Sequence, residues 1–311
     1  MFNRYLTYYS PAMQFVIFCA IMSMSLLLGA YIADLLNQKF LGVSSAALES
    51  MTELSPALAF KLKILNPVLL IIMLLLPALL FAYLAYPFPT KYLGMQKGVQ
   101  PMLLLMCIAL LGASLPIVSA LEEWSQKIPL FSNSGIDSYG VLTKSMLKGD
   151  QISDLLINIF SICLIPALAE EIFFRGCLQQ ILLNWLRSYP IIAILIVAIL
   201  FSAFHGQLSG FIPRVFLGLL LGLLYYYSGS LWLSILMHFV NNLIGVFFSF
   251  LKERGNITFD IMETTSVPIL WAVSSLVASV GLLYWFYTKR QEFIPIEVEK
   301  DDQTNDNIRI E

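Results

Sequence analysis

The sequence predicts an all-α, polytopic membrane protein of about eight transmembrane helices with a polar cavity inside the bundle. Of its 311 residues, 59% are hydrophobic and only 12% are charged, and the mean hydropathy is +0.80. A soluble domain averages about 45–50% apolar and about 25% charged residues. Apolar stretches also recur with the roughly 20-residue length that crossing a bilayer requires. The formal net charge of −2 excludes a strongly basic surface for nucleic acid.

Eight segments have the length and composition expected of spans. They are residues 13–36, 67–87, 101–121, 152–169, 190–205, 211–228, 231–251 and 267–287. The fifth is short for a span. The first is too long for a cleaved signal peptide and lacks the small-residue exit that such a peptide needs.

Two longer connections, one between the first and second spans and one between the third and fourth, carry mixed charge and are expected to hold short interfacial helices. They cover residues 37–66 and 122–151. Within the first, residues 46–65 place apolar side chains near a helical period, interrupted by Pro56. This pattern predicts a helix lying at the level of the lipid headgroups.

The chain divides into four parts on this interpretation. Residues 1–151 are N-terminal membrane helices and loops, residues 152–251 form the polar helical core, and residues 252–290 hold the last loop and span. Residues 291–311 are rich in Asp, Glu, Asn and Gln, which predicts a solvated, disordered tail. The four cysteines lie in apolar stretches without a CxxC pair, and are interpreted as packing residues.

The first polar cluster is Glu170-Glu171, with Arg175 following. Glu171 and Arg175 are four residues apart on a helix, with the acid first, which favours an ion pair. Glu170 then faces another direction without a local partner, which suits a general base or acid. Pro166, four residues before Glu170, frees a backbone carbonyl and is expected to bend the helix. The alternative is a pair of acids and an arginine at the membrane interface.

The second and third clusters contain the only two histidines of the chain, His205 and His238. His205 closes an apolar run, and Phe201 lies one turn before it on the same face. His238 and Asn242 share a face in the middle of a span, whereas Asn241 is expected to point elsewhere. Ionisable groups at membrane depth are costly and usually functional. The alternative roles are helix capping or interhelical hydrogen bonding for His205, and hydrogen bonding to another helix for His238.

Considered together, these clusters bring a carboxylate, two imidazoles and an amide from three helices, which are the groups that hydrolysis uses. Between them, Gly218 and Gly222 form a small-residue face that allows two helices to approach closely.

The motifs EExxxR (Glu170, Glu171, Arg175), FxxxH (Phe201, His205) and HxxxN (His238, Asn242) resemble, in order and spacing, those of the CAAX-protease and bacteriocin-processing family of intramembrane endopeptidases. The resemblance covers roughly residues 152–251. The family's eukaryotic members remove the last three residues of prenylated CAAX proteins. Its prokaryotic members are linked to peptide maturation or to immunity against bacteriocins.

The resemblance implies hydrolysis of peptide bonds in a membrane-associated or lipidated protein or peptide, with membrane lipids as surroundings and no nucleic acid. It also implies a multi-pass protein of a prokaryotic cell membrane. Glu170 and His205 would activate water, and His238 and Asn242 would stabilise the oxyanion. Glu171, Arg175 and Phe201 would support these residues.

Metal-independent catalysis by glutamate is favoured, and no cofactor is expected. The alternative is zinc held by Glu170, His205 and His238, although HExxH is absent and asparagine is a poor zinc ligand. Two other classes stay open, a non-catalytic scaffold or bacteriocin-immunity protein and a proton-coupled transporter. The inverted repeats typical of many transporters are not found in the sequence.

Overall fold

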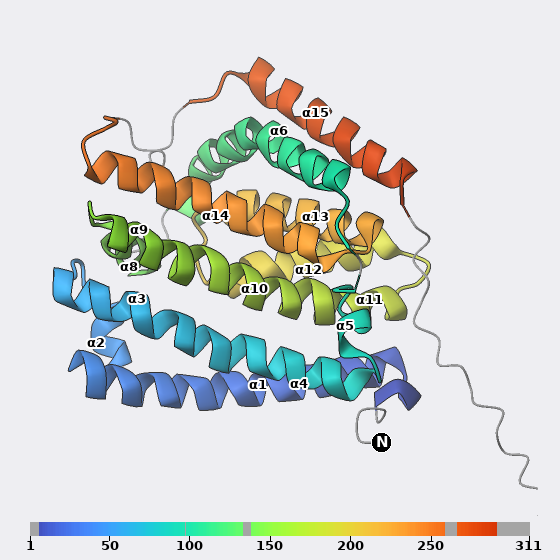
Figure 1. Ribbon diagram of the computed structural model, residues 1–311, viewed down its shortest axis with the longest axis horizontal. Helices are drawn as coiled ribbons and strands as arrows, with labels where there is room; N and C mark the ends of the chain where they lie inside the picture. Colours follow the sequence, from blue (N-terminus) through green and yellow to red (C-terminus); the bar gives the residue numbers. More distant parts are fainter. Residues whose placement is uncertain (1–5, 97, 133–137, 259–265, 291–311) are drawn as a thin grey trace, which may run out of the picture.

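Every regular element in the described part of the chain is a helix (Figure 1). The computed structural model describes residues 6–96, 98–132, 138–258 and 266–290. The tail expected at residues 291–311 lies outside this part.

By length and composition, seven helical stretches are able to cross a membrane. They are α1 with η2 (Pro11–Leu36, Asn37–Leu41); α3, η3 and α4 (Pro56–Leu70, Ile71–Leu75, Leu76–Ala85); α6 (Pro101–Gln126); α9, η4, α10, η5 and α11 (Ile152–Asn158, Ile159–Leu164, Ile165–Glu171, Ile172–Gln179, Gln180–Trp185); α13 (Phe211–Ser228); α14 (Leu231–Glu253); and α15 (Ile269–Thr288). An eighth apolar helix, α12 (Pro190–Phe204), has 15 residues. The shorter elements are α2 (Ser45–Glu49), α5 (Pro89–Tyr92), α7 (Pro129–Ser132) and α8 (Ser138–Leu147).

The long helices run roughly along one axis and form a bundle (Figure 1). Helices α1 and α3–α4 lie at one edge, and α6 and α15 lie at the other. Between them are the continuous α9–α11 helix and the helices α12, α13 and α14. The start of α1 and the end of α15 lie at the same end of the bundle.

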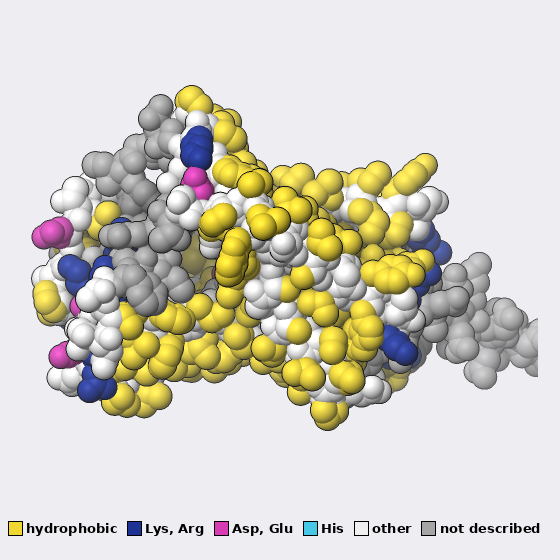
Figure 2. All heavy atoms as spheres, turned by 90° about the horizontal axis from the view of Figure 1, so that it is seen from above, with side chains coloured by type: hydrophobic (Ala, Val, Ile, Leu, Met, Phe, Trp, Pro, Cys, Tyr) yellow, Lys and Arg dark blue, Asp and Glu magenta, His cyan; other side chains and the backbone are white. Residues whose placement is uncertain are grey.

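Hydrophobic side chains cover the middle of the bundle, and charged side chains gather at its two ends (Figure 2). The apolar cover is exposed: Leu27, for example, is 76% accessible. Such a surface is stable only against lipid. The protein is therefore a multi-pass integral membrane protein, as predicted.

The second span begins earlier than expected, at Pro56 rather than at residue 67. Ser55 caps its N-terminus by accepting a hydrogen bond from the Leu58 N–H, and proline is favoured in a first helical turn. The interfacial helix predicted at residues 46–65 is therefore wrong in its second half, and only the short helix α2 precedes the span.

The fourth span also differs from the prediction, because it does not end at residue 169. One continuous helix of 34 residues runs from Ile152 to Trp185. It contains the π-helical segments η4 and η5, which shift the faces that the following residues present. Glu171 and Arg175 are fully buried in it, so they do not lie at a membrane interface.

The connection between the third and fourth spans holds the short helices α7 and α8, and short helices were expected there. Of the four cysteines, three are buried packing residues, as predicted. Cys19 is exposed on α1.

Candidate active site

The ion pair between Glu171 and Arg175 lies at the centre of the polar core. Arg175 Nη1 donates to Glu171 Oε1 at 2.7 Å, and both side chains are 0% exposed. Arg175 Nη2 donates to the Gly218 carbonyl at 3.2 Å, and its Cζ atom lies 4.5 Å from the ring centroid of Phe201. The guanidinium therefore joins η5 to α13 and α12.

Gly218 and Gly222 allow α12 and α13 to approach closely, as the sequence predicted. A Cβ atom at Gly218 would lie 3.2 Å from Ala198 and Phe201, and one at Gly222 would lie 2.6 Å from Ile194. A side chain at either position would push α13 away from α12, and with it the carbonyl that Arg175 contacts.

His238 is oriented by Glu171. The two groups lie 2.8 Å apart, between His238 Nδ1 and Glu171 Oε1. Because an ionised carboxylate only accepts hydrogen bonds, Nδ1 carries the proton in this contact. The imidazole then directs Nε2 towards Glu170.

Glu170 lies between the two histidines. Its Oε2 atom is 3.9 Å from Nε2 of His205 and 3.9 Å from Nε2 of His238. These distances are too long for direct hydrogen bonds. Among the described residues Oε2 has no hydrogen-bond partner, although it is buried. One carboxylate oxygen is thus directed at the gap between two imidazoles.

His205 is the C-cap residue of α12, and its ring is fixed by the preceding turn. Its Nδ1 atom lies 2.9 Å from the Phe201 carbonyl oxygen. Since a carbonyl only accepts, Nδ1 is the donor, and a neutral His205 presents an unprotonated Nε2 to Glu170. The Phe201 ring packs edge-on against both imidazoles, with centroids 5.0 Å and 5.9 Å away.

The Asn242 side chain hydrogen-bonds to a backbone carbonyl that lacks its usual helical donor, because residue 166 is a proline. Proline at position 166 cannot donate to the carbonyl four residues earlier, that of Ile162. Asn242 Nδ2 donates to this carbonyl at 3.3 Å. Asn241 was expected to point elsewhere, which is wrong, because its Nδ2 donates to Asn242 Oδ1 at 3.4 Å and it lies beside the same cavity.

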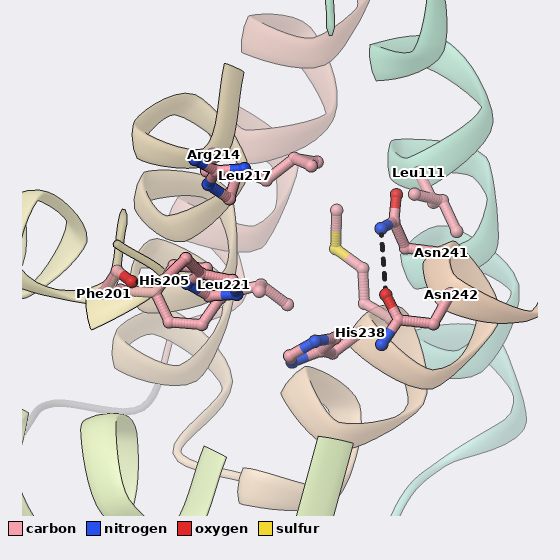
Figure 3. A pocket seen from close by; sticks show the side chains of 10 residues that line it. Leu111, Phe201, His205, Arg214, Leu217, Leu221, His238, Asn241 and Asn242 are labelled. Atoms are coloured by element: carbon pink, nitrogen blue, oxygen red, sulfur yellow. Dashed lines mark hydrogen bonds between the residues drawn. The ribbon is translucent and has the colours of Figure 1, made fainter. Parts of the chain in front are cut away.

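These side chains border a cavity of about 190 Å³, which has room for several water molecules. Its walls are formed by Leu111, Phe201, His205, Arg214, Leu217, Leu221, Met237, His238, Asn241 and Asn242. Figure 3 shows residues of α12 and α13 on one side, facing His238, Asn241 and Asn242 of α14 on the other. Glu170 is not among the lining residues, and it contacts the cavity only through the two imidazoles, 3.9 Å from each.

Arg214 is the charged residue on the cavity wall that the motif analysis did not single out. The sequence contains a signal for it, namely a lone cation near the start of the apolar segment 211–228. A charge in such a position is costly unless it is used.

The donor atoms do not form a metal site as they stand. Within the described ranges, no group of three or more His, Cys, Asp or Glu side chains has the arrangement needed to hold a metal ion. Glu171 is committed to Arg175 and His238, and the cavity face of α14 adds amides in place of a carboxylate.

Residues 152–244 match the family described as Rce1-like, type II CAAX prenyl endopeptidase Rce1-like. The match includes all three polar motifs. Neither the curated proteins nor the solved structures contain a match to the chain.

Proposed function

We propose that this protein is an intramembrane endopeptidase that uses Glu170 as its general base, because residues 152–244 match the family described as type II CAAX prenyl endopeptidase Rce1-like. The observation that carries this proposal is the buried Oε2 atom of Glu170, 3.9 Å from both imidazoles and without a hydrogen-bond partner among the described residues. An unpartnered carboxylate oxygen facing two imidazoles beside a cavity is suited to bind and deprotonate water.

In the proposed reaction, a water molecule lies between Glu170 and Nε2 of His205. Glu170 takes a proton from this water while the water oxygen attacks the carbonyl carbon of the scissile peptide bond. His205 orients the water by accepting its second hydrogen at the unprotonated Nε2. The C–N bond then breaks, and Glu170 returns its proton to the leaving amine, so that the carboxylate is regenerated.

The negative oxygen of the tetrahedral intermediate is proposed to bind His238 and Asn242. Asn242 uses one amide hydrogen for the Ile162 carbonyl and has a second for the oxyanion. Because Glu171 fixes Nδ1 of His238 as a donor, Nε2 donates only when the ring is an imidazolium. Donors of this kind contribute roughly 2.7–4 kcal/mol each to transition-state stabilisation.

The proposal is tested with Glu170→Gln. A fluorogenic lipidated peptide in proteoliposomes should be hydrolysed by the wild type and not by the variant, because the amide cannot take a proton from water. Thermal unfolding in detergent should be unchanged. Glu253→Gln, at the exposed end of α14, is the matched control and should keep full activity. Turnover by the Glu170→Gln protein would refute the proposed role.

Zinc-dependent hydrolysis is the alternative mechanism. In that case Glu170, His205 and His238 would have to move closer together than they are now, and zinc would polarise the scissile carbonyl. We favour the glutamate mechanism because Glu171 already pairs with Arg175 and His238, so no second carboxylate is left to act as base if Glu170 binds zinc. Metal content of the purified protein, and activity after chelation, distinguish the two mechanisms.

A non-catalytic scaffold or immunity protein would retain its cellular phenotype in the Glu170→Gln variant. A protease would lose it. The same substitution therefore separates these two classes in cells, and comparing membrane-associated peptides of the two strains identifies the substrate.

A further inference from the structure

We infer that the two cations that follow α15, Lys289 and Arg290, bind the headgroup of an anionic phospholipid. They lie at the end of the bundle where α1 starts and α15 ends, which we call the terminal end (Figure 1). Neither residue lines the cavity or belongs to one of the three motifs. The inference therefore does not depend on the proposed function.

The terminal end carries one sign of charge among the described residues. Its connecting segments are residues 6–10, 86–96, 98–100, 186–189, 229–230 and 289–290. They contain no Asp or Glu, and their cations are Lys91, Arg187, Lys289 and Arg290. The opposite end holds both signs, for example Lys39 and Glu53. On the face shown in Figure 2, Asp and Glu side chains are likewise visible towards only one end. A surface with uncompensated positive charge attracts an anionic partner.

Arg290 is held in place by a tyrosine ring and not by an acid. Its Cζ atom lies 3.9 Å from the ring centroid of Tyr287, a cation–π contact. Tyr287 packs in turn against Tyr227 of α13 and Tyr284 of α15, with centroids 5.7 Å and 6.0 Å away. Among the described residues, the Arg290 guanidinium has no hydrogen-bond acceptor and no ion-pair partner. The ring therefore orders the guanidinium while its five N–H donors stay available to a ligand.

The end of α15 lies at the level of the lipid headgroups. With 20 residues, Ile269–Thr288, the helix is roughly 30 Å long, which matches the thickness of the hydrocarbon layer. Lys289 and Arg290 follow directly and are exposed. The terminal end also exposes aromatic side chains of the two types that are enriched at membrane–water interfaces, namely Trp185, Tyr189, Trp232, Tyr284 and Tyr287. Lipid phosphate groups lie at this same level, so they are within reach of both cations.

These features define the chemistry of the ligand. A guanidinium forms two parallel hydrogen bonds with a phosphate, and Lys289 adds a second positive charge beside it. With no acid among the described residues of the terminal end, nothing there compensates the positive charge of a choline headgroup. A headgroup with net negative charge, such as that of phosphatidylglycerol, is therefore favoured over the zwitterionic headgroup of phosphatidylcholine.

The test offers the full-length protein in detergent an equimolar mixture of phosphatidylglycerol and phosphatidylcholine. Native mass spectrometry then gives the ratio of the two lipids that stay bound. Wild-type protein should retain mainly phosphatidylglycerol. The double variant Lys289→Gln, Arg290→Gln should lower the ratio by about 5-fold for each cation removed. Tyr287→Leu keeps both charges but releases the guanidinium, so it should cause a smaller fall.

The matched control is Lys252→Gln, Arg254→Gln, at the end of α14. Arg254 also lies over an aromatic ring, that of Phe250 at 5.5 Å, but Glu253 stands between the two cations in the sequence. This control should leave the lipid ratio unchanged. An equal fall in the control would overturn the inference, because it would indicate attraction to positive charge anywhere on the protein.

Two further outcomes would also overturn the inference. One is a wild-type ratio near one, which would make the Asp- and Glu-rich sequence 291–311 the alternative partner of these cations. The other is an unchanged ratio in the double variant. Cations at a helix C-terminus also stabilise the helix through its dipole. If that were their role, the double variant would unfold at a lower temperature to the same extent in the two lipids. We expect a loss of stability only with phosphatidylglycerol.

Discussion

Helix α1 and helix α14 both lie within the same apolar bundle, yet they are held in place by different interactions. Helix α1 packs mainly through apolar side chains, such as Phe18 against Phe81 and Phe173, with ring centroids 5.0 Å and 5.2 Å away. Helix α14 is fixed through polar contacts, including His238 to Glu171 and Asn242 to the Ile162 carbonyl.

This difference shows which kind of contact fixes the relative positions of the helices in this protein. Lipid tails are as apolar as the side chains of α1, so apolar contacts there give little direction to the packing. A buried hydrogen bond or ion pair is directional and is expensive to leave unmade. The polar contacts of α14 and η5 therefore fix the relative positions of Glu170, His205, His238 and Asn242 more tightly than apolar packing would.

The largest expected effect comes from breaking the buried ion pair. Arg175→Met should lower the free energy of unfolding by about 3–5 kcal/mol, because it leaves Glu171 as an uncompensated buried charge. Leu74→Met, a volume-conserving change in the packing against α1, should cost under about 1.5 kcal/mol. Unfolding in mixed micelles measures both. The double variant Glu171→Gln, Arg175→Met should regain part of the lost free energy of unfolding, because the uncompensated charge is removed. If the double variant is no more stable than Arg175→Met, this explanation is wrong.

A smaller effect is expected at the α6–α15 contact, where the Ser275 hydroxyl hydrogen-bonds to two backbone groups of α6. Ser275 Oγ accepts from the Ile117 N–H at 3.0 Å and donates to the Ala113 carbonyl at 2.5 Å. Ser275→Ala should reduce the free energy of unfolding by about 1–2 kcal/mol. Peptide hydrolysis should be unchanged, because α15 contributes no residue to the cavity. A fall in kcat would show that α15 influences the site.

The smallest effect is expected for Pro166→Ala. An N–H at position 166 would compete with Asn242 for the Ile162 carbonyl. It would therefore weaken the hydrogen bond that orients the Asn242 side-chain amide. We expect kcat to fall about 2- to 10-fold, the equivalent of one hydrogen bond, with little change in KM. Pro116→Ala, in α6, is the control and should leave kcat unaltered. A wild-type kcat in Pro166→Ala would mean that the carbonyl does not orient Asn242.

Much of the core could be predicted from the sequence because its signals are local. The four-residue spacing of Glu171 and Arg175 predicts their contact, and Pro166 predicts a free carbonyl. The partner of that carbonyl, Asn242, is 80 residues away, so only the fold identifies it. The same holds for Glu171 and His238, which lie 67 residues apart in sequence.

Two parts of the molecule could not be predicted, for definite physical reasons. The end of the fourth span was misplaced because charged residues normally end a span, whereas here η5 buries them against α12 and α13. Arg214 was not singled out because it lies in none of the three motifs, and its place on the cavity wall is set by the packing of α13 against α12. In both cases the position of a charge depends on neighbouring helices, which sequence composition does not describe.

The 15 residues of α12 also have a consequence for the surrounding lipid. A helix roughly 8 Å shorter than the hydrocarbon layer creates hydrophobic mismatch, and the adjacent leaflet must thin or admit water to relieve it. Thinning at the C-terminal end of α12 would bring water close to His205, its C-cap residue, and so to the cavity that this residue lines.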